Sequence, residues 1–241
     1  MTAPPSHSTN RAAILLGASG SVGQALLAEL VRSGQFEPII VVTRRALEVP
    51  SGTNVEQTLL PKMDPENLTQ AVIDVLDQRT VDAVGFSVLG VGAGTARLSL
   101  EQHRAIDVEL NAAFARGLKA SGKVRHLAFM SAVGADINAR TSGSGAAGMP
   151  RYARVKGESE AAVTREGPEV VSIFRPATII GSQHTPRYLP GLLSLVAPLM
   201  PAKFRSIRTT EIAKAMVAAA SRTPAKSAIY EYPEMMALIA A

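Results

Sequence analysis

Short runs of apolar residues alternate along the chain with longer segments in which apolar residues recur every three or four positions. The runs have the length and composition of buried strands and lie at 12–18, 38–45, 81–90, 124–132 and 169–181. The segments with helical spacing lie at 21–34, 65–79, 98–122 and 150–167. Proline stands at the expected start of two of these helices, at Pro65 and Pro150. The pattern predicts strands and helices in regular alternation.

Alternating strands and helices are typical of βαβ units, in which helices cover both faces of a parallel sheet. We therefore expect an α/β fold with a Rossmann-type doubly wound parallel sheet. The rhythm breaks after Arg175, and only a helix at 209–222 and a short strand at 227–232 are indicated beyond it. This predicts a core at 11–175 and a small C-terminal substrate-binding portion at 176–241, within a single compact domain. Residues 1–10 are polar and are expected to be a flexible leader.

The composition excludes several classes of protein. The 241 residues are 46% hydrophobic and 19% charged, as in globular proteins. The formal net charge of +5 comes without a long basic run, so we expect small anionic ligands and no nucleic acid. Cysteine is absent and the four histidines are widely spaced, so no metal site is expected. We also expect no membrane span and a cytoplasmic location.

Three glycines lie between the first strand and the first helix, in "GASGSVG". In dinucleotide-binding folds one such glycine makes the tight turn, one lets the backbone approach a pyrophosphate, and one lets the helix pack on the strand. Amides at the helix start then face the phosphates. The spacing here is GxxGxxG rather than GxGxxG, and a bare turn is the alternative. The position favours a cofactor loop made of Gly17, Ser19, Gly20, Ser21, Val22 and Gly23.

The second strand ends in Thr43, Arg44 and Arg45. A site for NAD commonly has Asp or Glu about 20 residues beyond the glycine loop, to bind the ribose 2′-hydroxyl. Arginine at this place suits the 2′-phosphate of NADP instead. The alternative is that both arginines merely solvate a strand end. The missing acid and the arginine pair together predict NADP(H) as the cofactor.

Tyr152 and Lys156 are four residues apart in the predicted helix at 150–167, so both project from one face. A phenol with a pKa of about 10 is a poor base at neutral pH, and a nearby cation favours its anion. YxxxK is a common pattern that also fits an exposed helix. Its place after the fifth strand of a glycine-loop fold favours an acid–base pair.

With the glycine loop, the arginine pair and YxxxK in this order, the chain resembles the short-chain dehydrogenase/reductase superfamily. Several segments are most similar to its atypical Tat-interacting-protein-type oxidoreductases, with NmrA-like proteins as cousins. These segments are "VVTRR", "FSVLG", "SAVGAD", "YARVKGESEA" and "FRPATIIG". The resemblance extends from about residue 11 to 182.

The resemblance implies a role for several residues. Tyr152 would exchange the substrate proton, while Lys156 would lower the tyrosine pKa and bind the nicotinamide ribose. Asp64 would touch adenine, although it also fits a helix N-cap before Pro65. Two further backbone segments would pass the cofactor, namely Val88, Leu89 and Gly90 after the fourth strand, and Pro176, Ala177, Thr178 and Ile179 after the strand at 169–175.

The chain departs from the family pattern in two places. The family's carbonyl-polarising hydroxyl falls on Ala132, one position after Ser131. Ser131 takes that role through a small shift, or Ser142 or Ser144 from the following loop serves, or the donor is missing. Ser131 also fits a structural hydroxyl bonded to backbone. Asp107 stands where extended members commonly carry Asn and is interpreted as a solvated helix residue, and His103 and His126 are interpreted as packing or surface residues.

The sequence thus predicts an NADP-dependent oxidoreductase that moves hydride between nicotinamide and a small carbonyl or alcohol substrate, with Tyr152, Lys156 and Ser131 at its catalytic site. A non-catalytic NADP(H)-sensing regulator of the NmrA-like type is the main alternative. An epimerase or dehydratase with the same cofactor is a third interpretation. A homodimer is possible, as in many relatives, and no feature of the sequence names the substrate.

Overall fold

A computed structural model describes residues 11–49, 51–181, 201–222 and 224–241. These residues contain a seven-stranded sheet in the order β3-β2-β1-β4-β5-β6-β9, with every neighbouring pair parallel. The strands are β1 (Arg11–Leu16), β2 (Phe36–Thr43), β3 (Val55–Leu59), β4 (Ala83–Ser87), β5 (Val124–Met130), β6 (Val170–Phe174) and β9 (Ala228–Tyr230). Strand order reverses between β1 and β4, which is the switch point of a Rossmann-type fold.

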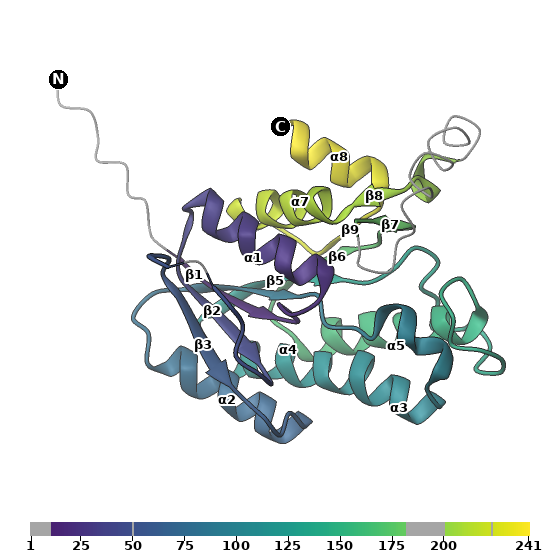
Figure 1. The fold of residues 1–241 in the computed structure, drawn as a ribbon, viewed down its shortest axis with the longest axis horizontal. Coiled ribbons are helices and arrows are strands. Elements are labelled where there is room, and N and C mark those ends of the chain that lie inside the picture. Colours follow the sequence, from purple (N-terminus) through teal and green to yellow (C-terminus); the bar gives the residue numbers. More distant parts are fainter. Residues whose placement is uncertain (1–10, 50, 182–200, 223) are drawn as a thin grey trace.

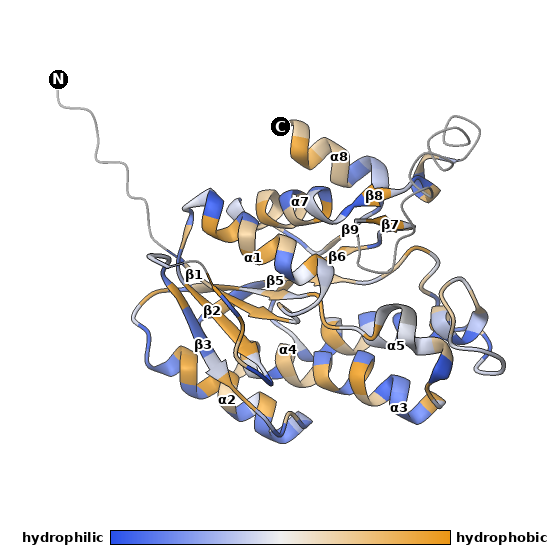
Figure 2. Ribbon diagram, viewed as in Figure 1, coloured by the Kyte–Doolittle hydropathy of each residue, from blue (hydrophilic) through white to orange (hydrophobic). Residues whose placement is uncertain are grey.

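Helices cover both faces of this sheet (Figure 1). On one face lie α1 (Ser21–Ser33) and α7 (Thr209–Ser221), with α8 (Tyr232–Ala240) packed on α7. The other face carries α2 (Pro65–Asp77), α4 (Asn111–Ala120) and α5 (Pro150–Glu166). Because both faces are covered, the central strands are apolar almost throughout, as the hydropathy colouring shows (Figure 2). The predicted fold class is confirmed.

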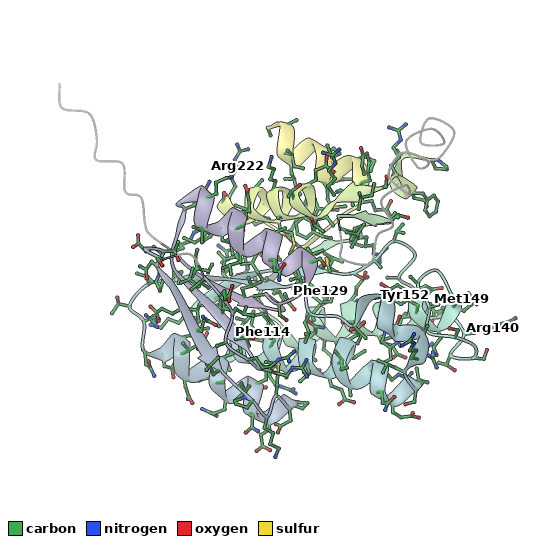
Figure 3. The ribbon with its side chains drawn as sticks, in the orientation of Figure 1. Phe114, Phe129, Arg140, Met149, Tyr152 and Arg222 are labelled. Atoms are coloured by element: carbon green, nitrogen blue, oxygen red, sulfur yellow. The ribbon has the colours of Figure 1, made fainter. Side chains whose placement is uncertain are left out.

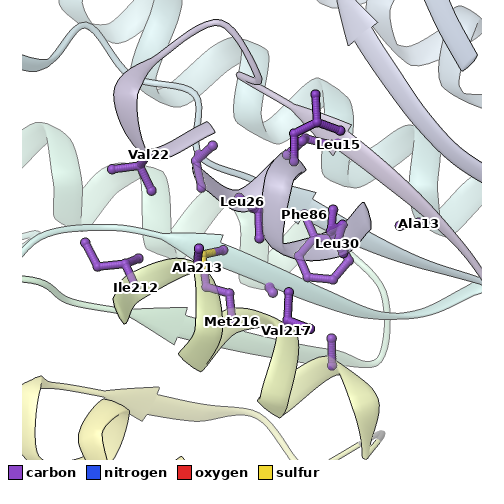
Figure 4. Close-up of a cluster of buried hydrophobic side chains, with 14 of the residues drawn as sticks. Ala13, Leu15, Val22, Leu26, Leu30, Phe86, Ile212, Ala213, Met216 and Val217 are labelled. Atoms are coloured by element: carbon purple, nitrogen blue, oxygen red, sulfur yellow. The ribbon is translucent and has the colours of Figure 1, made fainter. Parts of the chain in front are cut away.

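Each face of the sheet contributes to a separate apolar core. Between the sheet and α1 with α7, Leu26 and Leu30 of α1 lie among Met216 and Val217 of α7 and Phe86 of β4 (Figure 4). Phe114 of α4 and Phe129 of β5 belong to the core on the opposite face. The two cores pack against opposite faces of the sheet and hold the ends of its strands in fixed relative positions.

The long helix expected at 98–122 is interrupted. The short helix α3 (Leu100–Arg104) runs into the π-helical turn η2 (Ala105–Leu110), which continues as α4. A capping box at Ser99 and Gln102 starts α3, and the 3₁₀ turn η1 (Gly92–Arg97) precedes it. Periodicity alone does not reveal a single widened turn, which shifts the side chains that follow it around the helix axis.

The C-terminal part of the chain is joined to the main sheet. Helix α7 packs on α1, and β9 pairs with β6 at the sheet edge. A separate two-stranded ladder of β7 (Ile179–Ile180) and β8 (Ile207–Arg208) lies beside them, preceded by the 3₁₀ turn η4 (Ala202–Phe204). Helix α8 was not expected from the sequence. The leader at 1–10 lies outside the described residues, and the substrate-binding role of 176–241 stays a prediction.

Candidate functional site

The glycine loop and the segment after β4 meet at the switch point, because β1 and β4 are neighbours in the sheet. The Val88 amide donates to the Leu16 carbonyl at 3.0 Å. Gly17 has φ +91°, and a Cβ atom there would lie 2.6 Å from the Leu89 nitrogen and 2.8 Å from the Val88 carbonyl carbon. Only glycine permits both this backbone conformation and this close approach. The loop is therefore held directly against residues 88 and 89.

Within the described part of the chain, helix α1 begins without a side-chain cap. Gly20 occupies the N-cap position, and in the described residues no side chain caps this helix and no acidic residue lies in its first turn. A Cβ atom on Gly23, within the same turn, would lie 2.7 Å from the Ala18 Cα atom. The close packing explains glycine at position 23, and Ser19 and Gly20 are exposed to solvent. The amides of this turn can donate hydrogen bonds to an anion, as a pyrophosphate site requires.

The arginine pair lies at the end of β2. The Thr43 hydroxyl donates to the Arg45 carbonyl at 2.9 Å, which fixes the turn. Arg44 and Arg45 are exposed, and within the described part of the chain their guanidinium groups make no hydrogen bond or ion pair. The strand-end solvation interpretation and the phosphate interpretation both fit this exposure, so the binding role stays a prediction.

Asp64 is the N-cap of α2. Its Oδ1 atom accepts the Asn67 amide at 2.9 Å, and Oδ2 accepts the Asn67 side-chain amide at 2.7 Å. The hydrogen bond from the Asn67 backbone amide is the main reason that the pKa of Asp64 lies below its ordinary value. The N-cap alternative considered from the sequence is confirmed, and contact with adenine stays a prediction.

Tyr152 and Lys156 project from the first two turns of α5, where Pro150 starts the helix. Lys156 is buried, and its Nζ atom lies 5.8 Å from the centroid of the half-buried Tyr152 ring. Tyr152 lies near Met149 at one end of the molecule, well away from the central Phe114 and Phe129 (Figure 3). The helix spacing brings the pair together as the sequence predicts.

Lys156 also reaches the segment after β4. A Cβ atom on Gly90 would lie 3.3 Å from Lys156 Nζ, so the ammonium group rests against the Gly90 backbone. Residues 88 and 89 of the same segment contact Gly17. The glycine loop, the β4 end and the lysine of α5 are therefore neighbours at the carboxyl edge of the sheet.

Asp107 is the main residue that the sequence interpretation placed wrongly. It was expected to be solvated, yet it is 1% exposed, because the π-helical turn directs it inward. Its Oδ2 atom lies 3.1 Å from Lys156 Nζ and 3.1 Å from His103 Nε2, and its Oδ1 atom accepts the Val91 amide at 3.2 Å. The cluster of His103, Asp107 and Lys156 is thus buried beside Tyr152, whose ring centroid is 6.0 Å from that of His103.

The attraction between Asp107 and Lys156 outweighs the cost of burying their charges. Burial disfavours the charged form of Asp107, but Lys156 and the bond from His103 hold its pKa below the ordinary value. Burial likewise disfavours charged Lys156, but Asp107 and Tyr152 raise its pKa. Both groups are therefore charged at neutral pH.

A polar ladder supports Asp107. Asn111 donates its side-chain amide to the Asp107 carbonyl at 2.9 Å and to the Leu89 carbonyl at 3.3 Å. Ser87 donates to Asn111 Oδ1 at 2.5 Å, and the Ser159 hydroxyl donates to the Asp107 carbonyl. One signal in the sequence could have revealed this cluster: His103, Asp107 and Asn111 recur every four residues on a helix whose neighbours are largely apolar.

Ser131 follows β5 and is 3% exposed. Its amide donates to the Phe174 carbonyl at 2.7 Å, while its hydroxyl has no hydrogen-bond partner within the described residues. Within the described residues, the structural alternative for Ser131 therefore lacks the backbone hydrogen bond that it would require. Ser142 and Ser144 are exposed, and Ser144 accepts the Ala146 amide at 3.1 Å.

Two loops bring Ser131 and the Pro176 segment toward α5. The Val133 amide donates to the Pro176 carbonyl at 2.9 Å, and the Asp136 amide donates to the Ala153 carbonyl at 2.9 Å. Farther on, the Thr178 carbonyl accepts the Ile207 amide at 3.0 Å. The post-β5 loop is therefore tied both to residues 176–178 and to the helix that carries Tyr152.

The described residues contain neither a metal-binding cluster nor a membrane-spanning helix. They hold no group of three or more His, Cys, Asp or Glu side chains that could bind a metal ion. None of their helices is long and apolar enough to cross a membrane. One hollow on the described surface lies beside the outer faces of α4 and α5, and another lies at the amino ends of β1, β4 and β5.

Comparisons with known proteins show the family to which the chain belongs. The sequence profile of a family described as NAD(P)H-binding matches residues 17–223, so the chain belongs to that family. Protein FMP52, mitochondrial, of Eremothecium gossypii is 28% identical over 179 residues, which cover 72% of this chain and 68% of that protein. Protein HTATIP2 of Rattus norvegicus is 27% identical over 185 residues, covering 76% of this chain and 67% of that protein.

The fold also has solved counterparts. The structure of MoeE5 in complex with UDP-glucose and NAD matches with a TM-score of 0.63 at 16% identity, covering 95% of this chain and 81% of that chain. At this identity the likeness concerns the fold alone. Together with the family match and HTATIP2, it confirms the resemblance to short-chain dehydrogenase/reductase proteins of the atypical type.

Proposed function

We propose that the protein is an NADP-dependent oxidoreductase that reduces a small carbonyl compound, or oxidises the corresponding alcohol. One observation carries the proposal: buried Lys156 rests against Gly90, whose neighbours contact the glycine loop, and Tyr152 precedes it by one helical turn. A dinucleotide lying along the switch point would thus end beside an acid–base pair.

The residues present fit such a cofactor. The start of α1 would offer amides to the pyrophosphate, with Gly17, Ser19, Gly20, Ser21, Val22 and Gly23 around that place. Arg44 and Arg45 are exposed and would hold the 2′-phosphate, with Thr43 ordering their turn. Asp64, residues 88–90 and residues 176–179 would line the remaining length. When bound, the nicotinamide supplies or accepts the hydride.

The protein's own groups would handle the proton and the substrate oxygen. The Tyr152 hydroxyl would donate its proton to the oxygen of the reduced carbonyl. Lys156 has three N–H donors, of which one points to Asp107, so two remain for the ribose and the tyrosine oxygen. The Ser131 hydroxyl lacks another partner within the described residues and would hydrogen-bond the carbonyl oxygen, despite standing one position before the family's usual place.

The test of the chemistry is NADPH oxidation with a panel of aldehydes, ketones and quinones, followed by absorbance at 340 nm, a wavelength at which reduced nicotinamide absorbs. Tyr152→Phe should lose at least about a hundredfold in kcat, the order typical of general acid–base catalysis, with NADPH affinity retained. Ser131→Ala should lose a similar factor, whereas Ser144→Ala, on the exposed loop, should behave as wild type. A fully active Tyr152→Phe enzyme would contradict the assignment.

The cofactor preference has its own test. Fluorescence titrations should show tighter binding of NADPH than of NADH, and the preference should fall on replacing Arg44 and Arg45 by Ala. Lys119→Ala serves as the control, because Lys119 is another exposed cation, in the last turn of α4. An unchanged preference in the double variant would refute the arginine assignment.

A non-catalytic NADP(H)-sensing regulator is the second candidate. It is favoured by the pairing of Lys156 with Asp107 and by Ala132 at the place of the usual hydroxyl. NADPH binding without turnover of any substrate on the panel would favour this candidate. An epimerase or dehydratase would instead convert its substrate with no net change in NADPH.

Location and assembly are proposals of the same kind. We propose a cytoplasmic protein, although one relative is named mitochondrial, and cell fractionation of the tagged protein decides between the two. We also propose a homodimer with a small-molecule substrate bound near 176–241, which light scattering and substrate protection against proteolysis would test.

A further inference from the structure

We propose that Asp107, oriented by His103, is a positioning residue that cancels the charge of Lys156 and thereby moves proton transfer by Tyr152 to higher pH. The inference rests on the proposed function for its catalytic meaning. The observation behind it is the buried cluster of His103, Asp107 and Lys156.

The Asp107 side chain is fixed at both oxygens. Its Oδ2 atom is shared by Lys156 Nζ and His103 Nε2, each at 3.1 Å, and Oδ1 accepts the Val91 amide at 3.2 Å. The backbone carbonyl of the same residue accepts Asn111 and Ser159. A carboxylate held at both oxygens keeps one orientation, so it holds the Lys156 ammonium group in one position beside Tyr152.

The charge of the cluster follows from its hydrogen bonds. His103 must carry a proton on Nε2 to donate to Asp107. Its Nδ1 atom is buried without a partner in the described residues, and a bare acceptor costs less there than an unpaired cationic donor. Within the ion pair itself, the opposite charges of Asp107 and Lys156 sum to zero.

Other charged groups near the lysine are already balanced. Glu160 acts on Lys156 from α5, and Arg175 holds that carboxylate at 2.9 and 2.6 Å. Tyr152 is a further titratable group that acts on Lys156. The Tyr152 phenolate is therefore stabilised by a lysine whose charge is largely compensated. With Asn at position 107, the full positive charge would act on the phenolate.

The first test reads the Tyr152 phenolate directly and needs no substrate. The protein without cofactor is titrated from pH 7 to pH 11 while tyrosinate absorbance near 295 nm is recorded, with Tyr152→Phe in each background subtracted to isolate this residue. Asp107→Asn should move the midpoint down by about one pH unit. The double variant Asp107→Asn with Lys156→Met should return near the wild-type midpoint, because it again carries no net charge.

Glu158→Gln is the matched control. It also removes a carboxylate from the region of α5, but Glu158 faces Arg104 and Arg154, at 2.6 and 2.7 Å, and does not contact the lysine. Its midpoint should equal that of wild type. An unchanged midpoint in Asp107→Asn, or an equal shift in Glu158→Gln, overturns the proposed tuning.

The second test measures the pairing itself by thermal unfolding without cofactor. Each single replacement leaves a buried charge without its partner and should lower Tm by about 10 °C, whereas the double variant should lose less than the two single losses together. Additive losses overturn the pairing of Asp107 with Lys156. His103→Gln, which keeps an N–H donor, should stay closer to wild type than His103→Leu, and equal losses overturn the orienting role of His103.

Turnover assays separate this inference from the proposed function. If no substrate is turned over, the oxidoreductase assignment fails, yet the two tests above still decide whether Asp107 governs the tyrosine. With turnover, the pH–kcat profile of Asp107→Asn should move toward acid by the same amount, and a profile that stays in place overturns the catalytic meaning of the tuning.

Discussion

Gly17→Ala should disrupt both folding and cofactor binding. Gly17 has φ +91°, and a Cβ atom there would lie 2.6 Å from the Leu89 nitrogen and 2.8 Å from the Val88 carbonyl carbon. These are backbone atoms of the segment that follows β4, so no side-chain rotation relieves the clash. Either the glycine loop or the β4 end has to move.

The cost of this change has two parts. Holding alanine in the left-handed region costs about 1–2 kcal/mol, and displacing packed backbone costs about 1–3 kcal/mol more. The expected loss in the free energy of unfolding is therefore about 2–5 kcal/mol, a large share of the about 5–15 kcal/mol typical of a domain. Because the loop would move away from the switch point, the NADPH Kd should rise at least about tenfold.

Urea unfolding and a fluorescence titration with NADPH measure the two effects. Gly122→Ala is the matched control, since Gly122 also has positive φ, at +66°, and a Cβ atom there meets nothing within 4 Å. It should lose only about 1 kcal/mol and keep its NADPH affinity. Equal stability losses in the two variants, with cofactor affinity unchanged in both, would refute the close packing of the glycine loop.

Two further predictions concern pH and a helix cap. Burial, assisted by Arg11, lowers the pKa of His126 to about 4 from 6.5. As the pH falls, the unfolded chain therefore takes up a proton at His126 before the folded chain does, and the free energy of unfolding should drop by about 2 kcal/mol between pH 7 and pH 5. Urea titrations at the two pH values should show this drop in the wild type and not in His126→Gln. A drop that survives in the variant would assign it to other groups. Asp64→Ala should lower Tm more than Asp64→Asn, because asparagine also caps helices. If instead both variants weaken NADPH binding equally at unchanged Tm, Asp64 acts on the cofactor rather than on the helix.

The sequence predicts the central elements of the fold because their burial leaves a strong pattern. Strands such as β4 and β6 are buried throughout and read as apolar runs. Strand β3 lies at the sheet edge, half-exposed, and its residues VEQTL carry no such run. Helix α8 is only 9 residues long and has one buried side chain, so its periodicity is weak.

The site was predictable in its local motifs and not in its long-range contacts. The Tyr152–Lys156 pair depends on one helix, and spacing alone places it. The burial of Asp107 depends on the widened turn η2 and on Lys156, which lies 49 residues later in the chain. Spacing along the chain marks the polar residues of this helix but does not identify Lys156 as the partner of Asp107, because that partner comes from another helix.

A crystal structure of the complex with NADP⁺ tests the central claim most directly. We predict the 2′-phosphate at Arg44 and Arg45, the pyrophosphate at the start of α1, and the nicotinamide ring within reach of the Tyr152 and Ser131 hydroxyls, with Lys156 bonded to both the ribose and Asp107. A nicotinamide that points away from Tyr152, or a dinucleotide bound anywhere other than the switch point, would contradict the proposed oxidoreductase.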